Sequence, residues 1–210
     1  MKVKLLLLVV FLLITGALSA QIQTSTYFPA DKKYREFIDE TGNPLPGNPV
    51  MIIQSFVPNY GSYVWYLNEN RAKKSSFLDA DPKDLFGGIY LEDHGGLLEQ
   101  ITFKDFAQGL AQPIYLLSFC QVTDADHNGF PEFYLTYFEE SDGLDAKPLK
   151  VLVYTQNKDK KIVKAKLTGW IAYQEEDSYR EEEDANFKQL SQAIRLNAQK
   201  LLKSAQQTLN

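Results

Sequence analysis

The chain has few of the residues that supply redox, nucleophilic or zinc chemistry: its 210 residues include one cysteine, two histidines and two methionines. Cys120 has no second cysteine with which to form an internal disulfide. With only His94 and His127 in the chain, a Cys–His catalytic pair or a zinc site has few ways to form. The apolar run around Cys120 favours a buried strand position over a catalytic thiol. The sequence also lacks a glycine-rich phosphate loop and a Ser-centred nucleophile elbow, which removes the corresponding enzyme classes.

Positive charge and long apolar runs are scarce as well. The chain carries 22 basic and 27 acidic residues, for a net charge of −5. Nucleic acids and anionic lipids are bound through a basic face that displaces counterions, so we expect neither as a partner. An acidic chain is better suited to binding cations. After the first twenty residues, no stretch is long and apolar enough to cross a membrane, which takes about 20 apolar residues.

The first twenty residues have the pattern of a signal peptide. Lys2 and Lys4 give a positive start, Leu5–Ile14 is an apolar run, and Ala17–Ala20 supplies the small residues that precede cleavage. A membrane anchor is the alternative, but the apolar run is short for a span. We therefore predict cleavage before Gln21 and export to the periplasm or the extracellular space, without a lipid anchor because no cysteine follows the cleavage site. The exported chain keeps 20 basic and all 27 acidic residues, so its net charge is −7.

Residues 21–210, about 190 in number, are predicted to form a single domain of the α+β class. No internal repeat is visible, so a propeller or solenoid is not expected. Short apolar and aromatic runs separated by turn residues predict a predominantly antiparallel β-sheet of about eight strands. The polar, threonine-rich start, Gln21–Phe28, is expected to stay loose. The predicted strands are Val50–Val57, Ser62–Asn68, Ile89–Leu91, Leu97–Phe103, Ile114–Val122, Phe133–Phe138, Leu149–Thr155 and Ile162–Tyr173.

Helical patterns occur at both ends of this region. Asp31–Glu40 predicts a short helix, and Ala185–Leu209 has apolar residues at helical spacing, which predicts a C-terminal amphipathic helix packed on the sheet. The acidic run Glu175–Asp184 is expected to be a solvated loop. Asp81–Phe86 begins with Asp-Pro, which suits the N-cap and first position of a very short helix. Lys104–Leu110 suits one or two helical turns.

The most informative stretch is the acidic loop 122–132, Val-Thr-Asp-Ala-Asp-His-Asn-Gly-Phe-Pro-Glu. Oxygen-bearing side chains fall at positions 1, 3 and 5 of a calcium-type loop, a glycine takes the sharp turn at position 6, a backbone carbonyl falls at position 7 and an acid at position 9. The expected ligands are Asp124, Asp126, Asn128, the carbonyl of Phe130, and Glu132, with Gly129 at the turn. A hard cation takes six to eight oxygens, so the spacing predicts a calcium site. We expect a weak affinity of about 10⁻⁴ to 10⁻³ M, as in extracellular modules.

The flanks of this loop separate it from an EF-hand. Leu135 stands at position 12, where an EF-hand has a bidentate glutamate, and the flanking runs indicate strands rather than helices. The better analogy is the integrin-like (FG-GAP type) loop between two strands. His127 occupies an intervening position and should point to solvent. The alternative is a tight Asx-rich turn without a metal, since Asp, Asn and Gly are preferred in any hairpin loop, although inward-facing carboxylates would then repel one another.

Two other groups of residues have chemical potential. The Glu92-Asp93-His94 run could serve as acid, base and orienter, but two glycines follow it and a turn is the commoner explanation. An aromatic cluster could stack on sugar rings; its members are Tyr60, Tyr63, Trp65 and Tyr66. Strand alternation sends Tyr63 and Trp65 to one face and Val64 and Tyr66 to the other, so at least one of these pairs should lie in the core.

The acidic loop 122–132, the strand containing Tyr137, the run Leu149–Tyr154 and a lysine-rich strand ending near Gly169 together resemble a family of exported bacterial proteins described as surface polysaccharide biosynthesis proteins. The likeness covers residues 97–170 and implies a connection to the cell envelope, without catalytic residues to carry over. We therefore expect an exported, non-enzymatic envelope protein with a structural calcium loop, and carbohydrate or an envelope protein as its partner. A hydrolase that acts on envelope carbohydrate through paired carboxylates is the alternative.

Overall fold

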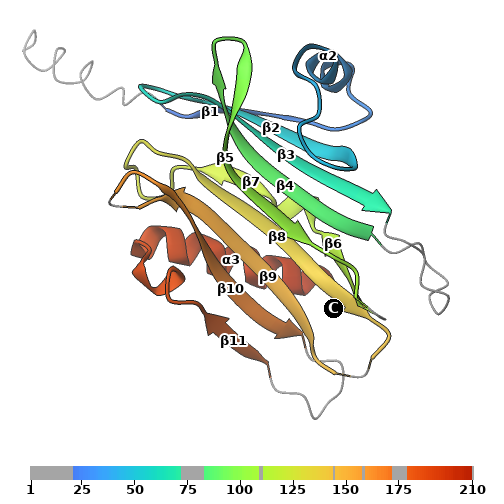
Figure 1. Ribbon diagram of the computed structural model, residues 1–210. Helices are drawn as coiled ribbons and strands as arrows, with labels where there is room; N and C mark the ends of the chain where they lie inside the picture. The colour runs from blue at the N-terminus through green and yellow to red at the C-terminus, as the bar shows by residue number, and fades with distance from the viewer. Residues whose placement is uncertain are drawn as a thin grey trace, which may run out of the picture.

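Two antiparallel sheets packed against each other form most of the protein (Figure 1). The computed structural model describes residues 21–71, 83–108, 111–143, 145–157, 159–171 and 179–209. Within these ranges the first sheet has the strand order β1-β2-β3-β4-β5, and the second has the order β11-β10-β9-β8-β6 with the short β7 paired to β8. The strands are β1 (Gln23–Tyr27), β2 (Asn48–Val57), β3 (Gly61–Arg71), β4 (Lys83–Asp93), β5 (Gly96–Asp105), β6 (Ala111–Tyr115), β7 (Gln121–Thr123), β8 (Glu132–Ser141), β9 (Lys147–Gln156), β10 (Ile162–Ile171) and β11 (Arg180–Glu183).

Two tight turns join neighbouring strands of the first sheet, β2 to β3 and β4 to β5. The β2–β3 turn contains Asn59 with a φ of 69° and Gly61 with a φ of 105°. The β4–β5 turn contains His94 with a φ of 49° and Gly95 with a φ of 81°. These left-handed conformations cost glycine little and asparagine less than most residues, so the turn sequences favour the reversals that bring successive strands side by side.

The main hydrophobic core lies between the two sheets. Trp65 on β3 meets Phe133 on β8 edge to face, with ring centroids 5.7 Å apart. Tyr63 and Trp65 point into this core, whereas Val64 and Tyr66 point to the opposite face of the first sheet, and all four side chains are buried. The strand alternation predicted from the sequence is therefore confirmed, and both pairs, rather than only one, lie in a core.

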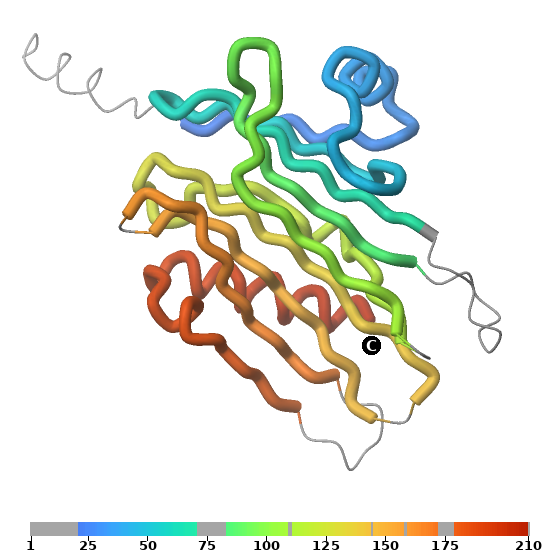
Figure 2. Tube along the Cα trace, in the orientation of Figure 1, coloured from blue at the N-terminus to red at the C-terminus, as the bar shows by residue number. Residues whose placement is uncertain are grey.

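A helix covers the outer face of each sheet. Helix α2 (Lys32–Thr41) packs on the first sheet, and helix α3 (Gln192–Leu209) packs on strands β8, β9 and β10 of the second. The order of layers is thus α2, first sheet, second sheet, α3 (Figure 2). The buried residues of α3 are Ile194, Ala198, Leu201, Leu202 and Ala205. Their spacing of three and four residues explains why the amphipathic pattern of the sequence predicts this contact.

The predominantly antiparallel α+β architecture and the C-terminal helix on the sheet are confirmed, but the described residues contain eleven strands rather than about eight. The start of the described chain, expected to be loose, contains β1, which pairs with β2 from Gln23↔Phe56 to Tyr27↔Ile52. β1 lies at an edge and exposes most of its side chains, so no hydrophobic alternation marks it in the sequence.

The two short helices predicted inside the sheet region are wrong where the structure describes them. Lys83–Phe86 is the start of β4 and pairs with the end of β3, while Asp81 and Pro82 lie outside the described residues. Lys104 and Asp105 complete β5, and Gln108 forms an isolated bridge with Ala111; residues 109–110 lie outside the described residues. In both places pairing with neighbouring strands outweighs the local helical signal.

The acidic run before α3 also differs from its prediction. Arg180–Glu183 forms β11, which pairs with β10 at the edge of the second sheet, and residues 175–178 lie outside the described residues. The helix begins at Gln192 rather than near Ala185, because the 3-10 turn η2 (Phe187–Gln189) comes first. Phe187 is fully buried there, and its N–H donates to Asp184 Oδ1 at 2.7 Å.

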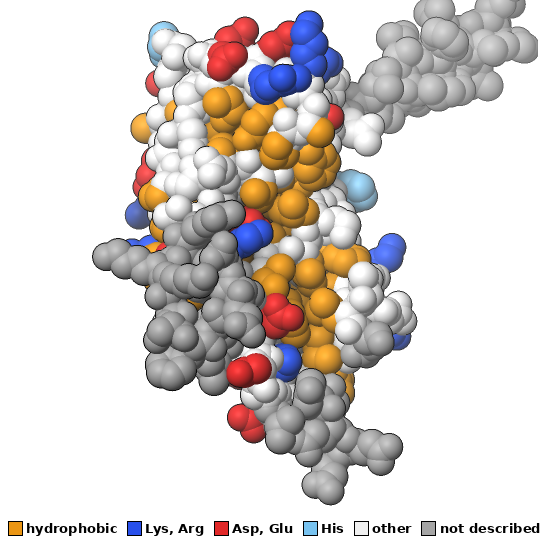
Figure 3. All heavy atoms as spheres, turned by 90° about the vertical axis from the view of Figure 1, so that its right-hand side faces the viewer, with side chains coloured by type: hydrophobic (Ala, Val, Ile, Leu, Met, Phe, Trp, Pro, Cys, Tyr) orange, Lys and Arg blue, Asp and Glu red, His pale blue; other side chains and the backbone are white. Residues whose placement is uncertain are grey.

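The surface of the protein mixes charged and apolar side chains. Figure 3 shows one face, with charged side chains of both signs gathered at the top and hydrophobic side chains running down the middle. None of the described helices has the length and apolar character that a membrane crossing requires. The predicted leader, residues 1–20, lies outside the described residues.

Candidate metal centre

The acidic loop joins β7 to β8, the two strands that form its base. Thr123 pairs with Glu132, and Val122 pairs with Phe133, so the residues that enter and leave the loop are neighbours across the ladder. Within the loop His127 has a φ of 56° and Gly129 a φ of 83°. These two left-handed residues curl the backbone back on itself, which is the bend expected of the glycine at position 6.

Three of the predicted ligands converge. Carboxylate oxygens of Asp124, Asp126 and Glu132 all lie within 4.8 Å of one another. Glu132 is fully buried, and the two aspartates are half-buried. These three carboxylates can hold a metal ion, because their oxygens are as close to one another as the ligands of a single cation and are donors that hard cations prefer.

Backbone amides hold these carboxylates in place. Ala125 N–H donates to Glu132 Oε2 at 2.7 Å, and Gly129 N–H donates to Asp124 Oδ2 at 3.1 Å. Asn128 N–H donates to Asp126 Oδ1 at 3.3 Å. The loop backbone therefore orients each of the three carboxylates, which lowers the cost of assembling a site around an ion.

Two oxygens of the cluster, Asp124 Oδ1 and Glu132 Oε1, are buried and accept no hydrogen bond from the described residues. A buried acceptor without a partner is costly, and a buried carboxylate close to two others is costlier still. Burial raises the pKa of the Glu132 carboxyl from 4.5 to about 8, and the neighbouring Asp126 and Asp124 add to the rise. A cation would partner both free oxygens and offset the mutual repulsion of the three charges.

The remaining two predicted ligands are the side chain of Asn128 and the backbone carbonyl of Phe130. The Asn128 side chain is exposed, and its Oδ1 accepts a hydrogen bond from Phe130 N–H at 2.7 Å. The Phe130 ring is 2% exposed and packs edge to face against Tyr60 at 5.3 Å and Tyr63 at 5.9 Å. Phe130 thus anchors the loop to the first sheet. His127 is exposed, as the sequence predicts.

Thr123 belongs to the site although its sequence position gave no ligand role. Its hydroxyl donates to Glu132 Oε2 at 3.1 Å, beside the bond from Ala125 N–H. The register of the β7–β8 pair could have identified it, because this register places Thr123 opposite Glu132. The full burial of Glu132 was also not evident, because an acid at the start of a strand is usually exposed.

The other candidates from the sequence do not form a reactive site. Asp93 Oδ1 and His94 Nδ1 are 2.5 Å apart, but both side chains are exposed at the tip of the β4–β5 turn. Tyr63, Trp65 and Tyr66 are buried and cannot offer a stacking platform for sugars, whereas Tyr60 is 38% exposed and packs against Phe130.

Cys120 is a structural residue. The run predicted as one strand, Ile114–Val122, is interrupted by the 3-10 turn η1 (Leu117–Phe119), and Cys120 follows this turn. Its Sγ accepts a hydrogen bond from Thr136 N–H at 3.3 Å. Burial raises the pKa of the Cys120 thiol to about 12, so the reactive thiolate is not formed at neutral pH.

Comparisons of the chain with protein-family models, curated proteins and solved structures gave no match. The resemblance to surface polysaccharide proteins therefore stays a prediction.

Proposed function

We propose that the protein is an exported, non-enzymatic cell-envelope protein whose β7–β8 loop binds calcium, and that the ion stabilises the fold. The observation that carries the calcium proposal is the Glu132 carboxylate, which is fully buried, offers one unpartnered oxygen and lies beside two aspartates. Such an arrangement is costly in the absence of a cation and favourable around one.

The donor set favours calcium over other ions. The carboxylates of the cluster are hard oxygen donors, while zinc and copper sites usually include histidine or cysteine. The spacing of the loop adds an amide at Asn128 and a backbone carbonyl at Phe130 as further oxygen donors. Calcium accepts six to eight oxygens in flexible geometry, whereas magnesium requires a near-ideal octahedron. A loop that offers several protein oxygens within a few residues therefore suits calcium better.

The position of the loop supports a stabilising role. Phe130 leaves the loop and packs against Tyr63 of β3, while Glu132 begins β8 of the second sheet. An ion that fixes the loop would hold this contact between the sheets in register. The leader-like residues 1–20 and the resemblance to surface polysaccharide proteins support export and a place in the envelope.

The test is thermal unfolding of the protein in calcium chloride, magnesium chloride and EDTA. At calcium concentrations of about 100 times the Kd, we expect a stabilisation of about 2.7 kcal/mol, because the ion binds only the folded state. For a chain of this size that corresponds to a rise in Tm of about 5–10 °C. Magnesium should give a smaller rise.

Matched variants separate a site-specific effect from a general salt effect. Asp126→Asn should remove most of the rise in Tm that calcium causes. Asp39→Asn, which alters an exposed carboxylate on α2, should retain that rise. Equal Tm values in calcium and EDTA for the wild-type protein would refute the proposal.

The hydrolase alternative is less well supported. A glycosidase acid needs a raised pKa and access to the substrate. Glu132 has the raised pKa, but its side chain is closed to solvent. We therefore assign this carboxyl to cation binding rather than to acid catalysis.

A further inference from the structure

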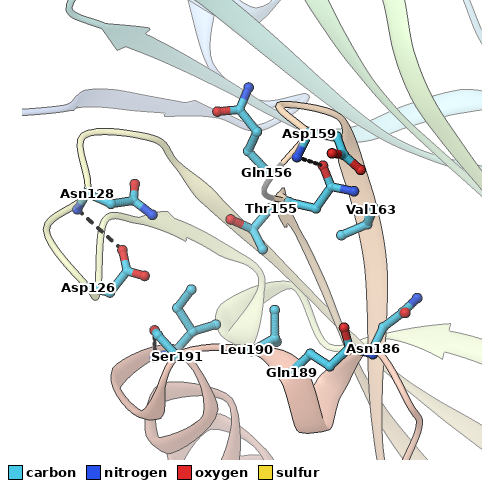
Figure 4. Close-up of a pocket in the computed structure, with 12 residues that line it drawn as sticks. Asp126, Asn128, Thr155, Gln156, Asp159, Val163, Asn186, Gln189, Leu190 and Ser191 are labelled. Carbon is cyan, nitrogen blue, oxygen red and sulfur yellow. Dashed lines mark hydrogen bonds between the residues drawn. The ribbon is translucent and has the colours of Figure 1, made fainter.

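A pocket of about 510 Å³ with both polar and apolar lining residues opens beside the acidic loop. Figure 4 shows that its walls come from three parts of the chain: the β7–β8 loop, the β9–β10 hairpin, and the segment from η2 to the start of α3. The volume lies within the range of about 300–1,000 Å³ that is usual for small-molecule sites.

Three amide side chains line this pocket: Gln156, Asn186 and Gln189. Each uses its nitrogen to hold a backbone carbonyl: Gln156 Nε2 donates to Lys160 O at 3.0 Å, Asn186 Nδ2 to Lys164 O at 2.9 Å, and Gln189 Nε2 to Ala185 O at 3.2 Å. Their amide oxygens remain as acceptors. Together with the carboxylates of Asp126 and Asp159, they make a wall rich in acceptors, which suits a ligand rich in hydroxyl donors.

Thr155 supplies an independent sign of a ligand. It is 2% exposed, it lines the pocket, and its Oγ1 makes no hydrogen bond in the part of the chain that the structure describes. In Figure 4 its side chain lies between the acidic loop and η2. A buried hydroxyl without a partner is costly, and a hydroxylated ligand in the pocket would satisfy it.

Charge and shape narrow the ligand class. Among the described lining residues there are two acids and no lysine, arginine or histidine, so an anionic ligand would meet repulsion without compensation. Val163, Leu190 and Ile194 add apolar surface that fits the C–H face of a sugar ring.

We propose that this pocket binds a neutral sugar, with the amide oxygens and the Thr155 hydroxyl hydrogen-bonding its hydroxyl groups. Asp126 and Asn128 belong both to the pocket and to the acidic loop, so calcium, which orders the loop, strengthens sugar binding. This coupling rests on the proposed function, whereas the sugar site itself does not. By linkage, the sugar strengthens calcium binding by the same factor.

The experiment is a titration of the full exported chain with neutral mono- and disaccharides, uronic-acid disaccharides and spermidine, followed by ligand-observed NMR in calcium and in EDTA. We expect binding of at least one neutral sugar, no binding of the uronic acids, and weaker binding in EDTA. Thr155→Val should weaken sugar binding about tenfold, the contribution of one hydrogen bond, without lowering the Tm, because the hydroxyl it removes has no hydrogen-bond partner among the described residues.

Ser55→Ala is the matched control. It removes another fully buried, unpartnered hydroxyl, located on β2 of the first sheet, and should leave sugar binding unchanged. Failure of every neutral sugar to bind, or tighter binding of spermidine than of any sugar, would overturn the sugar site. If the Tm of the wild-type protein does not rise in calcium but a neutral sugar still binds, the proposed function and the coupling are overturned and the sugar site remains.

Discussion

Thr123 and Glu132 face each other across the β7–β8 pair, and the Thr123 hydroxyl donates to Glu132 Oε2 at 3.1 Å while Glu132 Oε1 is left without a partner. One oxygen of this buried carboxylate thus accepts hydrogen bonds from the protein, and the other accepts none from the described residues. The second oxygen therefore lacks a positive partner, which a cation bound in the loop would supply.

Glu132→Gln should have opposite effects with and without calcium. In EDTA at pH 8 the neutral amide removes a buried charge, and its NH₂ can donate to the aspartates, so the variant should be more stable than the wild type by about 1–3 kcal/mol. In calcium the variant lacks a charged ligand and should be less stable than the wild type. Chemical denaturation in the two buffers measures both effects, and a loss of stability in both buffers would contradict this account.

The stability of the metal-free protein should fall as the pH rises from 5 to 8. Burial raises the pKa of Glu132 from 4.5 to about 8, so between these values the folded state binds more protons than the unfolded state. The free energy of unfolding then decreases with pH, because the stabilising proton is lost as pH passes through the folded pKa. The measurement is Tm against pH in EDTA, and Glu132→Gln should flatten the curve.

Phe130→Ala should destabilise the protein by about 3–5 kcal/mol, since it leaves a cavity between the acidic loop and the first sheet where a fully packed ring stood. Phe56→Ala provides the comparison, because Phe56 is 51% exposed and its loss should cost less than about 0.5 kcal/mol. Urea unfolding measures the loss of stability in both variants. Similar losses in the two would show that Phe130 does not anchor the loop.

Lys150 should contribute to the contact between the sheets. Its Nζ pairs with Glu139, lies 3.8 Å from Asp105 Oδ2 of β5, and lies 5.2 Å from the centroid of the Tyr137 ring. The side chain is 19% exposed, so Lys150→Ala leaves two carboxylates poorly compensated and should cost about 1–3 kcal/mol. Lys164→Ala, at an exposed position on β10, should cost less than about 0.5 kcal/mol in the same urea titration.

The amphipathic helix was predictable from the helical spacing of its buried side chains, and the central strands were predictable because they are runs of apolar and aromatic residues between turns. The buried stripe of α3 from Ile194 to Ala205 has helical spacing, and Tyr63 and Trp65 alternate with Val64 and Tyr66. The edge strands β1 and β11 were missed because their side chains are mostly exposed. They are held by backbone pairing, which requires no hydrophobic pattern in the sequence. The start of β4 was misread because Asp81-Pro82 resembles a helix start, while pairing with β3 decides its structure.

The candidate site was predictable in its ligand types and less so in its surroundings. The i, i+2 spacing of Asp124 and Asp126 and the later Glu132 gave the three carboxylates that converge. Local spacing carries no information on the β9 and α3 segments that complete the pocket, because these come from distant parts of the chain. The unpartnered hydroxyl of Thr155 depends on that tertiary packing as well.

The most direct test of the calcium site is a crystal structure of the protein grown in calcium chloride, with an anomalous difference map. The account predicts one peak surrounded by oxygens of Asp124, Asp126 and Glu132 at about 2.3–2.6 Å, the distances usual for calcium. A map without a peak at this position, in a crystal where Glu132 keeps its buried orientation, would contradict it.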